Sequence, residues 1–247
     1  DGKLYAPGAN VPAEVTKLTA QFALSEQFSL KPGGTYYFDL SGTGIRGTAH
    51  SRLPDKTLHY VPFTYAGTVD AYALTSEMAT TDAYAERYKY PHSLFIADYN
   101  VTHTVSWENL NSAGLIFGKG YTSGGVEYTL GAPSVGSSGI GSNYSQHGIP
   151  QSNEWDKILD KYDGYIKNWS KIYSWGQDTA HNYAQGRANR GYSSARNWSF
   201  YESSGAKSHL GFRPVLEVLN ANTLGAYGLK AITLDLGGGK LGGSSEA

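Results

Sequence analysis

Residues 172–215 read IYSWGQDTAHNYAQGRANRGYSSARNWSFYESSGAKSHLGFRPV, and this stretch decides how the chain is interpreted. It holds eight aromatic residues and five Lys or Arg residues, against only two acids. Gly191, Gly205 and Gly211 have a spacing typical of turns between short strands. Rigid aromatics, arginine and small polar residues dominate the contact surfaces of binding proteins. The stretch therefore predicts a recognition surface.

The composition of the whole chain narrows the classes of protein to which it can belong. Of its 247 residues 40% are hydrophobic, which is enough for a sizeable core. Its net charge of -1 argues against nucleic acid as a partner, because neutralising phosphates requires a basic surface. The sequence contains no cysteine, which excludes disulfides, thiolate metal sites and cysteine nucleophiles. It has no apolar run of about 18 residues, so we expect no membrane insertion within it.

Between the chain ends, turn and periodicity signals predict an α+β body. Short strands are expected within residues 28–40 (around a Pro-Gly-Gly turn), 60–65 and 71–75, and a longer strand at 92–102. Helices are expected at 106–113 and 151–161, with a Gly- and Ser-rich loop at 131–148 and further short strands after Gly164. In the second helix Trp155, Ile158 and Leu159 share one face, and Ser152 is the predicted N-cap.

Both ends of the chain resemble parts of a single repeat. Residues 1–8 (DGKLYAPG) and 15–22 (VTKLTAQF) are similar to the closing third of the B-type repeat of internalin-like bacterial surface proteins. Residues 229–240 (LKAITLDLGGGK) are similar to the opening strand and Gly-Gly turn of that repeat. Two hairpin-prone ends of an ordinary domain are the alternative. The resemblance implies an inserted domain at 24–220, with the end of one β-rich repeat at 1–23 and a linker and the start of the next repeat at 221–247.

Four motifs in the body resemble, in the same order, the formylglycine-generating-enzyme-like branch of the C-type lectin fold. They are YNVT (99–102) before a helix with Trp107, IPQSNEW (149–155), IYSW (172–175), and RANRGY (187–192) followed by GFR (211–213). The resemblance implies short helices packed on an irregular antiparallel β-sheet. We expect Phe212 to lie in the core, and Arg190 and Arg213 to be structural, with Arg213 paired to a buried acid or to carbonyl groups.

The same branch includes the variable ligand-binding proteins of diversity-generating retroelements, found in phage and in bacterial surface proteins. Their variable positions lie between the late strand Trp and the closing Gly-Phe-Arg. The resemblance therefore implies an adhesin- or receptor-type domain at a bacterial cell surface or cell wall, with 176–210 as the segment open to diversification. Its expected partner is a protein or glycan on another cell, a phage or a host.

The expected binding residues lie on the late loops, where a rigid frame holds exposed side chains. If residues 192–198 are extended, Tyr192, Ser194, Arg196 and Trp198 share one face. The alternative is that Tyr192 and Trp198 cover the core while the rest is solvated loop. The full predicted set is Asp178, His181, Asn182, Tyr183, Asn189, Tyr192, Ser194, Arg196, Trp198, Tyr201, Ser204 and His209.

An enzyme is the second class to consider. The oxidases of this fold branch bind copper through paired cysteines, which this chain lacks, and related iron enzymes use three histidines. The seven histidines here show no His-x-His or His-Glu-x-x-His spacing. Calcium binding through Asp178 and Asn182 is conceivable, but Asp and Asn are too sparse to favour it. We expect no catalytic residues, metal or cofactor. A sulfatase-modifying type of enzyme with an altered or lost metal site, and a structural spacer, remain the alternatives.

Overall fold

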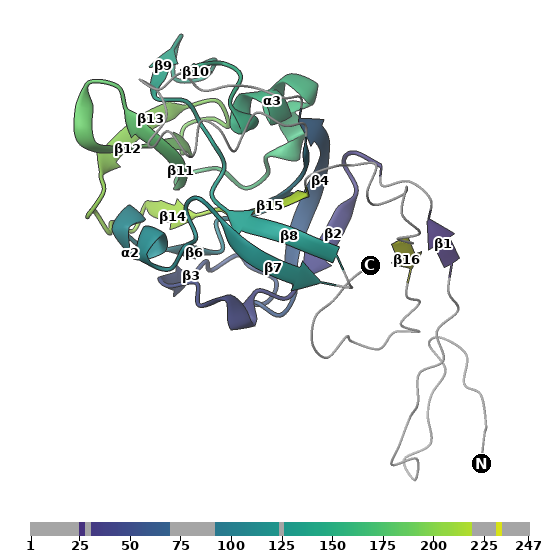
Figure 1. The fold of residues 1–247 in the computed structure, drawn as a ribbon. Coiled ribbons are helices and arrows are strands. Elements are labelled where there is room, and N and C mark those ends of the chain that lie inside the picture. Colours follow the sequence, from purple (N-terminus) through teal and green to yellow (C-terminus); the bar gives the residue numbers. More distant parts are fainter. Residues whose placement is uncertain (1–24, 28–30, 70–91, 124–125, 219–230, 234–247) are drawn as a thin grey trace, which may run out of the picture.

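The computed structural model describes residues 25–27, 31–69, 92–123, 126–218 and 231–233 (Figure 1). They form an α+β fold that is rich in strands and has few, short helices, as the sequence predicts. The predicted strand at 71–75 and the motifs at 1–8 and 15–22 lie outside the described residues. Of the motif at 229–240, only residues 231–233 are described. None of the described helices is long and apolar enough to cross a bilayer.

Two six-stranded sheets build most of the fold, where the sequence led us to expect one irregular sheet. The first, antiparallel throughout, has the order β2 (Thr35–Phe38), β4 (Val61–Val69), β5 (His92–Ala97), β15 (Val215–Val218), β8 (Val126–Gly131) and β7 (Lys119–Ser123). The second has the order β13 (Trp198–Glu202), β12 (Tyr183–Gly191), β11 (Tyr173–Ala180), β14 (Leu210–Phe212), β6 (Thr102–His103) and β3 (Thr48–Ala49). In this sheet β11 and β14 run parallel and the other neighbours antiparallel.

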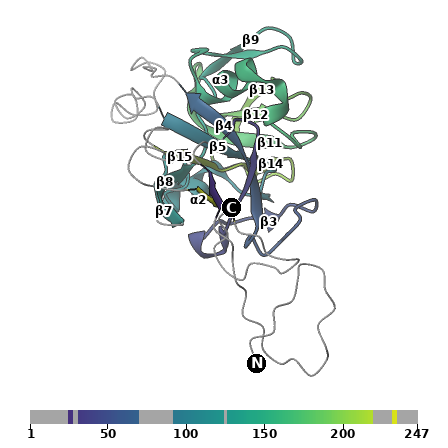
Figure 2. The same cartoon turned by 90° about the vertical axis from the view of Figure 1, so that its right-hand side faces the viewer.

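Smaller elements complete the described chain. Two further antiparallel pairs are β9 (Ser138–Ile140) with β10 (His147–Ile149), and β1 (Ser25–Gln27) with β16 (Ala231–Thr233). The helices are α2 (Trp107–Ser112) and α3 (Glu154–Lys161), with 3-10 turns η1 (Ser41–Thr43) and η2 (Asp163–Tyr165). Both views of the ribbon place α3, β9, β12 and β13 together at one end of the domain (Figures 1 and 2).

The core has two parts, and β5 separates them. All six residues of β5 are buried, and its neighbours β4 and β15 pair with it on both edges. Because successive side chains of a strand point to opposite faces, Phe95 enters one hydrophobic cluster while Leu94 and Ile96 enter the other. The first cluster includes Trp175 and Phe212, and the second lies beneath α3. The alternating pattern of β5 therefore holds the two sides of the fold together.

Helix α3 shows how the sequence fixes local structure. Trp155, Ile158 and Leu159 are buried, which confirms the predicted face. The predicted N-cap Ser152 is wrong by one residue: Asn153 Oδ1 accepts a hydrogen bond from Asp156 N at 2.9 Å. Both side chains are good caps, and the helix begins at Glu154 instead of residue 151. Helix α2 lies within the predicted range of 106–113.

Two other expectations about elements need correction. The strand predicted at 92–102 is two strands, β5 and β6, in different sheets. The chain leaves β5 at Asp98, whose carboxylate accepts a hydrogen bond from Thr64 Oγ1 at 2.5 Å and an ion pair from Lys167 at 3.1 Å. In addition, the Gly- and Ser-rich loop at 131–148 contains β9 and the start of β10. The chain after Gly164 contains β11 and β12, of eight and nine residues, as well as short strands.

Candidate ligand-binding surface

The predicted binding residues lie mostly on β12, β13 and the loops around them. β13 is the last strand of its sheet and pairs only with β12 among the described strands. Tyr201 therefore points to one face of the sheet, while Trp198 and Phe200 point to the other. The structure divides the predicted surface into two groups, one on each face of β13.

The first group is an aromatic cluster of Tyr173, Tyr192, Tyr201 and His209. The rings of Tyr173 and Tyr192 are stacked, with centroids 4.8 Å apart and planes 12° apart. Tyr201 lies 5.7 Å from Tyr173, and His209 lies 5.2 Å from Tyr201 and 6.1 Å from Tyr192. Lys207 places its Nζ 5.1 Å from the centre of the Tyr201 ring. Tyr192, Tyr201 and His209, which were predicted, thus gather around Tyr173, which was not.

The backbone holds Tyr192 in an unusual conformation. Its φ is 78°, a left-handed value that is uncommon for residues other than glycine. Its N–H donates to Trp169 O, and its carbonyl accepts from Lys171 N, both at 3.0 Å. The side chain is still 39% exposed. Strained residues held by surrounding hydrogen bonds are common at functional sites, and here the strain presents a tyrosine ring to solvent.

The aromatic cluster carries little charge of its own. Burial, followed by the nearby Lys207, lowers the pKa of His209 below its usual value. Burial, followed by Tyr173 and Tyr192, raises the pKa of the Tyr201 phenol. Both directions favour the neutral forms of His209 and Tyr201. Lys207 adds an ammonium group at the rim, in position for a cation–π contact with Tyr201.

The second group is an apolar edge formed by Tyr183, Trp198 and Phe200. Phe200 lies between the other two, with ring centroids 5.8 Å from Tyr183 and 5.9 Å from Trp198, and is 44% exposed. Tyr183 Oη donates to Glu202 Oε1 at 3.0 Å. Trp198 Nε1 donates to Gly136 O at 2.9 Å, which ties the indole to the loop before β9.

Two predicted binding residues are wrong, because Asp178 and Asn189 are fully buried. Asp178 Oδ2 accepts a hydrogen bond from Val135 N at 2.6 Å. Burial and the nearby Glu154 raise the pKa of Asp178 to about 7, despite the hydrogen bonds from backbone N–H groups. Asn189 pairs in register with Trp175 and faces the protein interior. Both residues belong to long strands, β11 and β12, where the sequence led us to expect exposed loops and short strands.

The expectation that residues 192, 194, 196 and 198 share an extended face is also wrong. Residues 192–197 form the turn between β12 and β13. Arg196 pairs with Asp160 at 3.2 Å and with Asp163 at 2.9 Å, next to α3. Ser194 Oγ donates to Asn143 O at 2.7 Å in the loop between β9 and β10. Ser194 and Arg196 therefore fix this turn to its neighbours, although both remain partly exposed.

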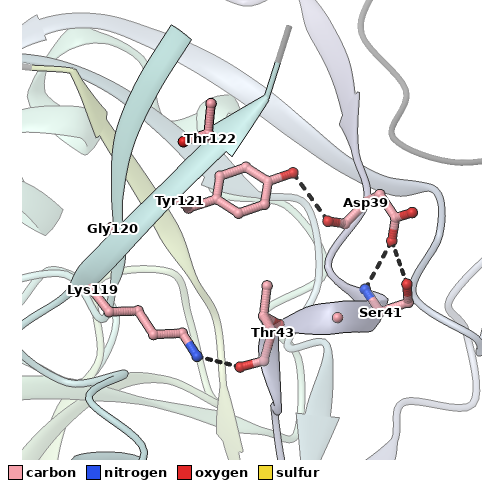
Figure 3. A pocket seen from close by; sticks show the side chains of 8 residues that line it. Asp39, Ser41, Thr43, Lys119, Gly120, Tyr121 and Thr122 are labelled. Carbon is pink, nitrogen blue, oxygen red and sulfur yellow. Dashed lines mark hydrogen bonds between the residues drawn. The ribbon is translucent and has the colours of Figure 1, made fainter. Parts of the chain in front are cut away.

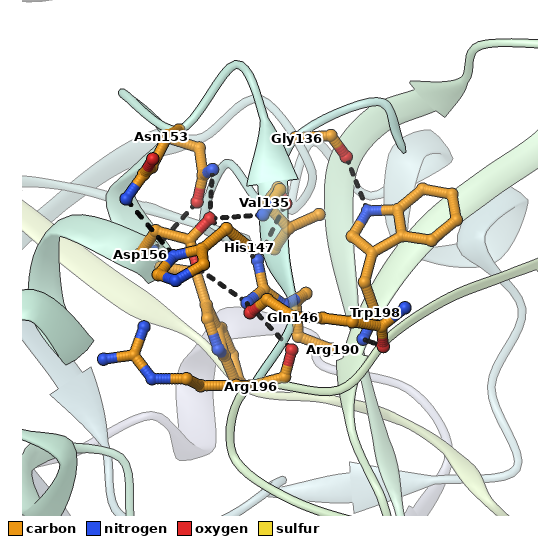
Figure 4. A network of polar contacts seen from close by, with 12 residues as sticks. Val135, Gly136, Gln146, His147, Asn153, Asp156, Arg190, Arg196 and Trp198 are labelled. Atoms are coloured by element: carbon orange, nitrogen blue, oxygen red, sulfur yellow. Dashed lines mark hydrogen bonds and ion pairs between the residues drawn. The ribbon is translucent and has the colours of Figure 1, made fainter. Parts of the chain in front are cut away.

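Arg190 locks the turn from beneath, as predicted for a structural residue. Its Nη2 and Nη1 donate to the two carboxylate oxygens of Asp156 at 2.7 and 3.2 Å, and neither side chain is exposed. The guanidinium also donates to the carbonyls of Val135, Gln146 and Arg196, at 3.1 to 3.3 Å (Figure 4). One buried arginine thus connects α3, the loop before β9 and the turn after β12.

Arg213 performs a similar role at the end of β14, which confirms the second structural arginine. It donates to carbonyl groups, Ala97 O at 2.6 Å and Asn168 O at 3.3 Å, and to Ser174 Oγ at 3.2 Å. Burial lowers the pKa of Arg213 to about 10, opposed by Asp98, so the group stays charged at neutral pH. Phe212 is fully buried, as predicted.

The remaining predicted residues are exposed but belong to neither group. His181 and Asn182 form the turn between β11 and β12, and Ser204 follows β13. Tyr173, Phe200 and Lys207 were not predicted from the sequence. Phe200 was detectable from its spacing of two residues from Trp198, which places both on one face of a strand. Within the described ranges, no group of three or more His, Cys, Asp or Glu side chains is arranged to hold a metal ion. Comparisons of the chain with protein-family models, curated proteins and solved structures gave no match.

Proposed function

We propose that this chain carries an adhesin- or receptor-type ligand-binding domain of a bacterial surface protein, which recognises a protein or glycan through the aromatic cluster and the apolar edge. The observation that carries the proposal is the exposed Tyr192 ring, stacked on Tyr173 and held by backbone hydrogen bonds. Tyrosine provides a large contact area at low entropic cost and a hydroxyl for hydrogen bonding. A surface of this kind suits recognition without bond chemistry.

Rigidity of the frame supports this proposal. The turn at 192–197 is fixed by Arg190 from below and by Arg196 and Ser194 at its sides. Side chains that are ordered before binding lose little conformational entropy when a ligand arrives. The same contacts leave Tyr192 and Phe200 free to face solvent, so the frame and the surface use different residues.

The pairing of β1 with β16 fits display on a larger protein. β1 and β16 pair antiparallel, with Glu26 opposite Ile232, so the chain enters and leaves the domain side by side. In Figure 1 this pair lies on the far side of the domain from β12 and β13. An insertion between repeats would then present the aromatic cluster and the apolar edge away from the flanking chain.

Several buried residues support the proposed relationship to the C-type lectin fold. Trp155, Trp175 and Phe212 occupy the motifs on which the resemblance rests, and all three are fully buried. Arg190 and Arg213 make the structural contacts that the late motifs require. The variable proteins of diversity-generating retroelements offer the closest functional analogy, and under that analogy the exposed positions within 176–210 are the diversified ones.

The test is a binding screen with matched variants. The wild-type chain is applied to a glycan array and to an array of bacterial, phage and host surface proteins. We expect a Tyr192→Ser/Tyr201→Ser double variant to bind its best ligand about a hundredfold or more weakly, because aromatic hot spots contribute about 2 kcal/mol each. Tyr144→Ser is the control, since Tyr144 is 74% exposed and lies outside both groups. Binding by the double variant that equals the wild type, with both proteins folded by circular dichroism, would exclude the proposed surface.

A further inference from the structure

A second candidate site lies on the first sheet, away from β12 and β13 (Figure 1). β2 and β7 are the two edge strands of that sheet, yet the sheet curls so that they approach each other. The rings of Phe38 in β2 and Tyr121 in β7 pack edge to face, with their centroids 6.4 Å apart. Tyr121 Oη donates to Asp39 O at 3.0 Å, and Lys119 Nζ donates to Thr43 O. Figure 3 shows both side chains reaching from β7 towards the chain after β2.

Above these contacts lies a groove of about 500 Å³. Its lining side chains are those of Asp39, Ser41, Thr43, Lys119, Tyr121 and Thr122. They provide one carboxylate, one ammonium group, a phenol and the hydroxyls of Ser41 and Thr122, whereas the Thr43 hydroxyl donates to Leu40 O at 2.5 Å. Apart from the Tyr121 ring, the lining side chains are polar or glycine. A lining of this kind is unsuited to an apolar ligand, because it would leave desolvated polar groups without partners.

The polar groups of the groove are held in place by the protein. Asp39 Oδ1 accepts from Ser41 N at 2.9 Å and from Ser41 Oγ at 2.6 Å, and Oδ2 contacts His59 Nδ1 at 3.0 Å. Partial burial acts to raise the pKa of Asp39, but the hydrogen bonds from Ser41 and His59 outweigh it and lower that pKa. Asp39 is therefore ionised at neutral pH and opposes the charge of Lys119. Neither an anion nor a cation has a clear electrostatic advantage in this groove.

The hydrogen-bonding capacity favours a ligand that both donates and accepts. An ammonium group has three donors, and the contact with Thr43 uses one donor of Lys119. The hydroxyls of Ser41 and Tyr121 donate to Asp39 and keep lone pairs that can accept. Neighbouring hydroxyl groups on a sugar ring supply both functions, and the ring's C–H face can pack on an aromatic side chain such as Tyr121.

We propose that the groove between η1 and β7 binds one residue of a neutral saccharide. The site goes beyond the proposed function, because it shares no residue with the aromatic cluster or the apolar edge. A ligand of this size, held mainly by hydrogen bonds, is expected to have a dissociation constant of about 1–10 mM. A second, weak saccharide site would raise the overall affinity of a surface protein for a glycan-coated cell.

Two glycines allow a precise perturbation of the groove. A Cβ atom built on Gly42 or Gly120 meets no other atom within 4 Å, and both glycines line the groove. Gly42→Leu therefore adds a bulky apolar side chain to the lining of the groove, at a position where its Cβ displaces no neighbour. Ser204→Leu, at an exposed position after β13, is the matched control for adding an apolar side chain. Tyr192→Ala removes the proposed aromatic surface and leaves the groove intact.

The experiment follows backbone amide signals of the 15N-labelled chain by NMR in phosphate-free buffer. The probes are the methyl glycosides of glucose, galactose, mannose and N-acetylglucosamine, each to about 50 mM, several times the expected dissociation constant. Inorganic phosphate is added separately. We expect saturable shifts of the amide signals of residues 41–43 and 119–122 with at least one glycoside. At the same glycoside concentration, these shifts should be about tenfold or more smaller in Gly42→Leu and should be retained in Ser204→Leu and Tyr192→Ala.

Three results would overturn the saccharide site. They are no saturable shift at these amides with any of the four glycosides, equal shifts in Gly42→Leu, and shifts with phosphate alone. Because Tyr192→Ala is expected to lose binding in the array screen but keep the groove shifts, failure of the groove and failure of the aromatic surface give different results.

Discussion

Arg190 and Asp156 form a bidentate ion pair, and neither side chain is exposed to solvent. Asp156 also accepts a hydrogen bond from Gly148 N at 2.5 Å, and its backbone N–H is capped by Asn153. The pair thus connects the start of α3, the end of the β9–β10 hairpin and the turn that carries Tyr192. The proposed binding surface is built on this buried pair, although neither side chain of the pair is exposed.

We expect Asp156→Ala to lower the free energy of unfolding by about 3–5 kcal/mol, because it leaves the buried charge of Arg190 without its carboxylate partner. Arg196→Gln is the matched comparison. Its ion pairs involve Asp160 and Asp163, which are 41% and 70% exposed, so the expected loss is below about 1 kcal/mol. Urea unfolding followed by circular dichroism measures both. Similar losses in the two variants would contradict the different roles assigned to the two arginines.

A second prediction concerns the left-handed backbone of Tyr192. We expect Tyr192→Gly to be more stable than Tyr192→Ala by about 0.5–1 kcal/mol, because alanine keeps the strain at a φ of 78° and glycine relieves it at some entropic cost. Both variants lose the stack on Tyr173, so that loss cancels in the comparison. Thermal and urea unfolding of the two variants give the difference. An alanine variant as stable as the glycine variant would show that the backbone at residue 192 is not strained.

Part of the fold and of the candidate site could be predicted from the sequence. The burial of Phe212, Arg190 and Arg213 was predictable, because each belongs to a motif with a clear structural role. The apolar face of α3 was equally plain from its helical spacing. Tyr192, Tyr201 and His209 belong to the predicted binding set, and the structure brings their rings together, although Tyr201 lies on a strand and not on a loop.

The errors have a common physical cause. Asp178 and Asn189 are polar, and in a presumed loop they were assigned to the surface. In the structure they belong to a long β-hairpin, whose register shifts between Trp175 and Thr179. Burial of a polar residue depends on partners from distant chain, such as Val135 N for Asp178. Such partners cannot be inferred from local periodicity, and the same is true of the contacts that tie Arg196 to Asp163.

The buried carboxyl of Asp178 predicts a specific pH dependence. Its pKa is raised to about 7 in the folded protein, above the value of about 3.9 in an unfolded chain. The folded state therefore favours the protonated form, and the stability that this provides is fully present below about pH 4 and is lost as pH rises to about 7. We expect Asp178→Asn, whose amide oxygen can still accept from Val135 N, to remove this contribution.

The measurement is the free energy of unfolding of both proteins at pH 5 and pH 8, by urea titration. From pH 5 to pH 8 the wild type should lose roughly 1–3 kcal/mol more than Asp178→Asn. Taking the difference between the two proteins cancels the contributions of other titrating groups, including His209. The same pH dependence in both proteins would show that Asp178 does not titrate in this range.

The last prediction compares two residues of β13: Trp198 is expected to stabilise the fold, and Phe200 is expected to contact the ligand. Trp198 and Phe200 lie on the same face of β13, but the Trp198 indole packs against the second core cluster and donates to Gly136 O, whereas the Phe200 ring is 44% exposed. Gly139 can approach Trp198 closely only because it has no side chain: a Cβ there would lie 2.9 Å from the tryptophan Cβ. We expect Trp198→Ala to cost about 2–3 kcal/mol of stability and Phe200→Ala less than about 1 kcal/mol.

For ligand binding we expect the opposite order: among folded proteins, Phe200→Ala should lose more affinity than Trp198→Ala. At a temperature where both proteins are folded, Phe200→Ala should weaken binding to the ligand found in the array screen about tenfold, through loss of direct contact. A triple variant with alanine at Tyr192, Arg196 and Trp198 should be destabilised, because the Arg196 and Trp198 side chains anchor the turn between β12 and β13. If Phe200→Ala binds as the wild type does, the apolar edge plays no part in recognition, and the aromatic cluster alone makes the contact.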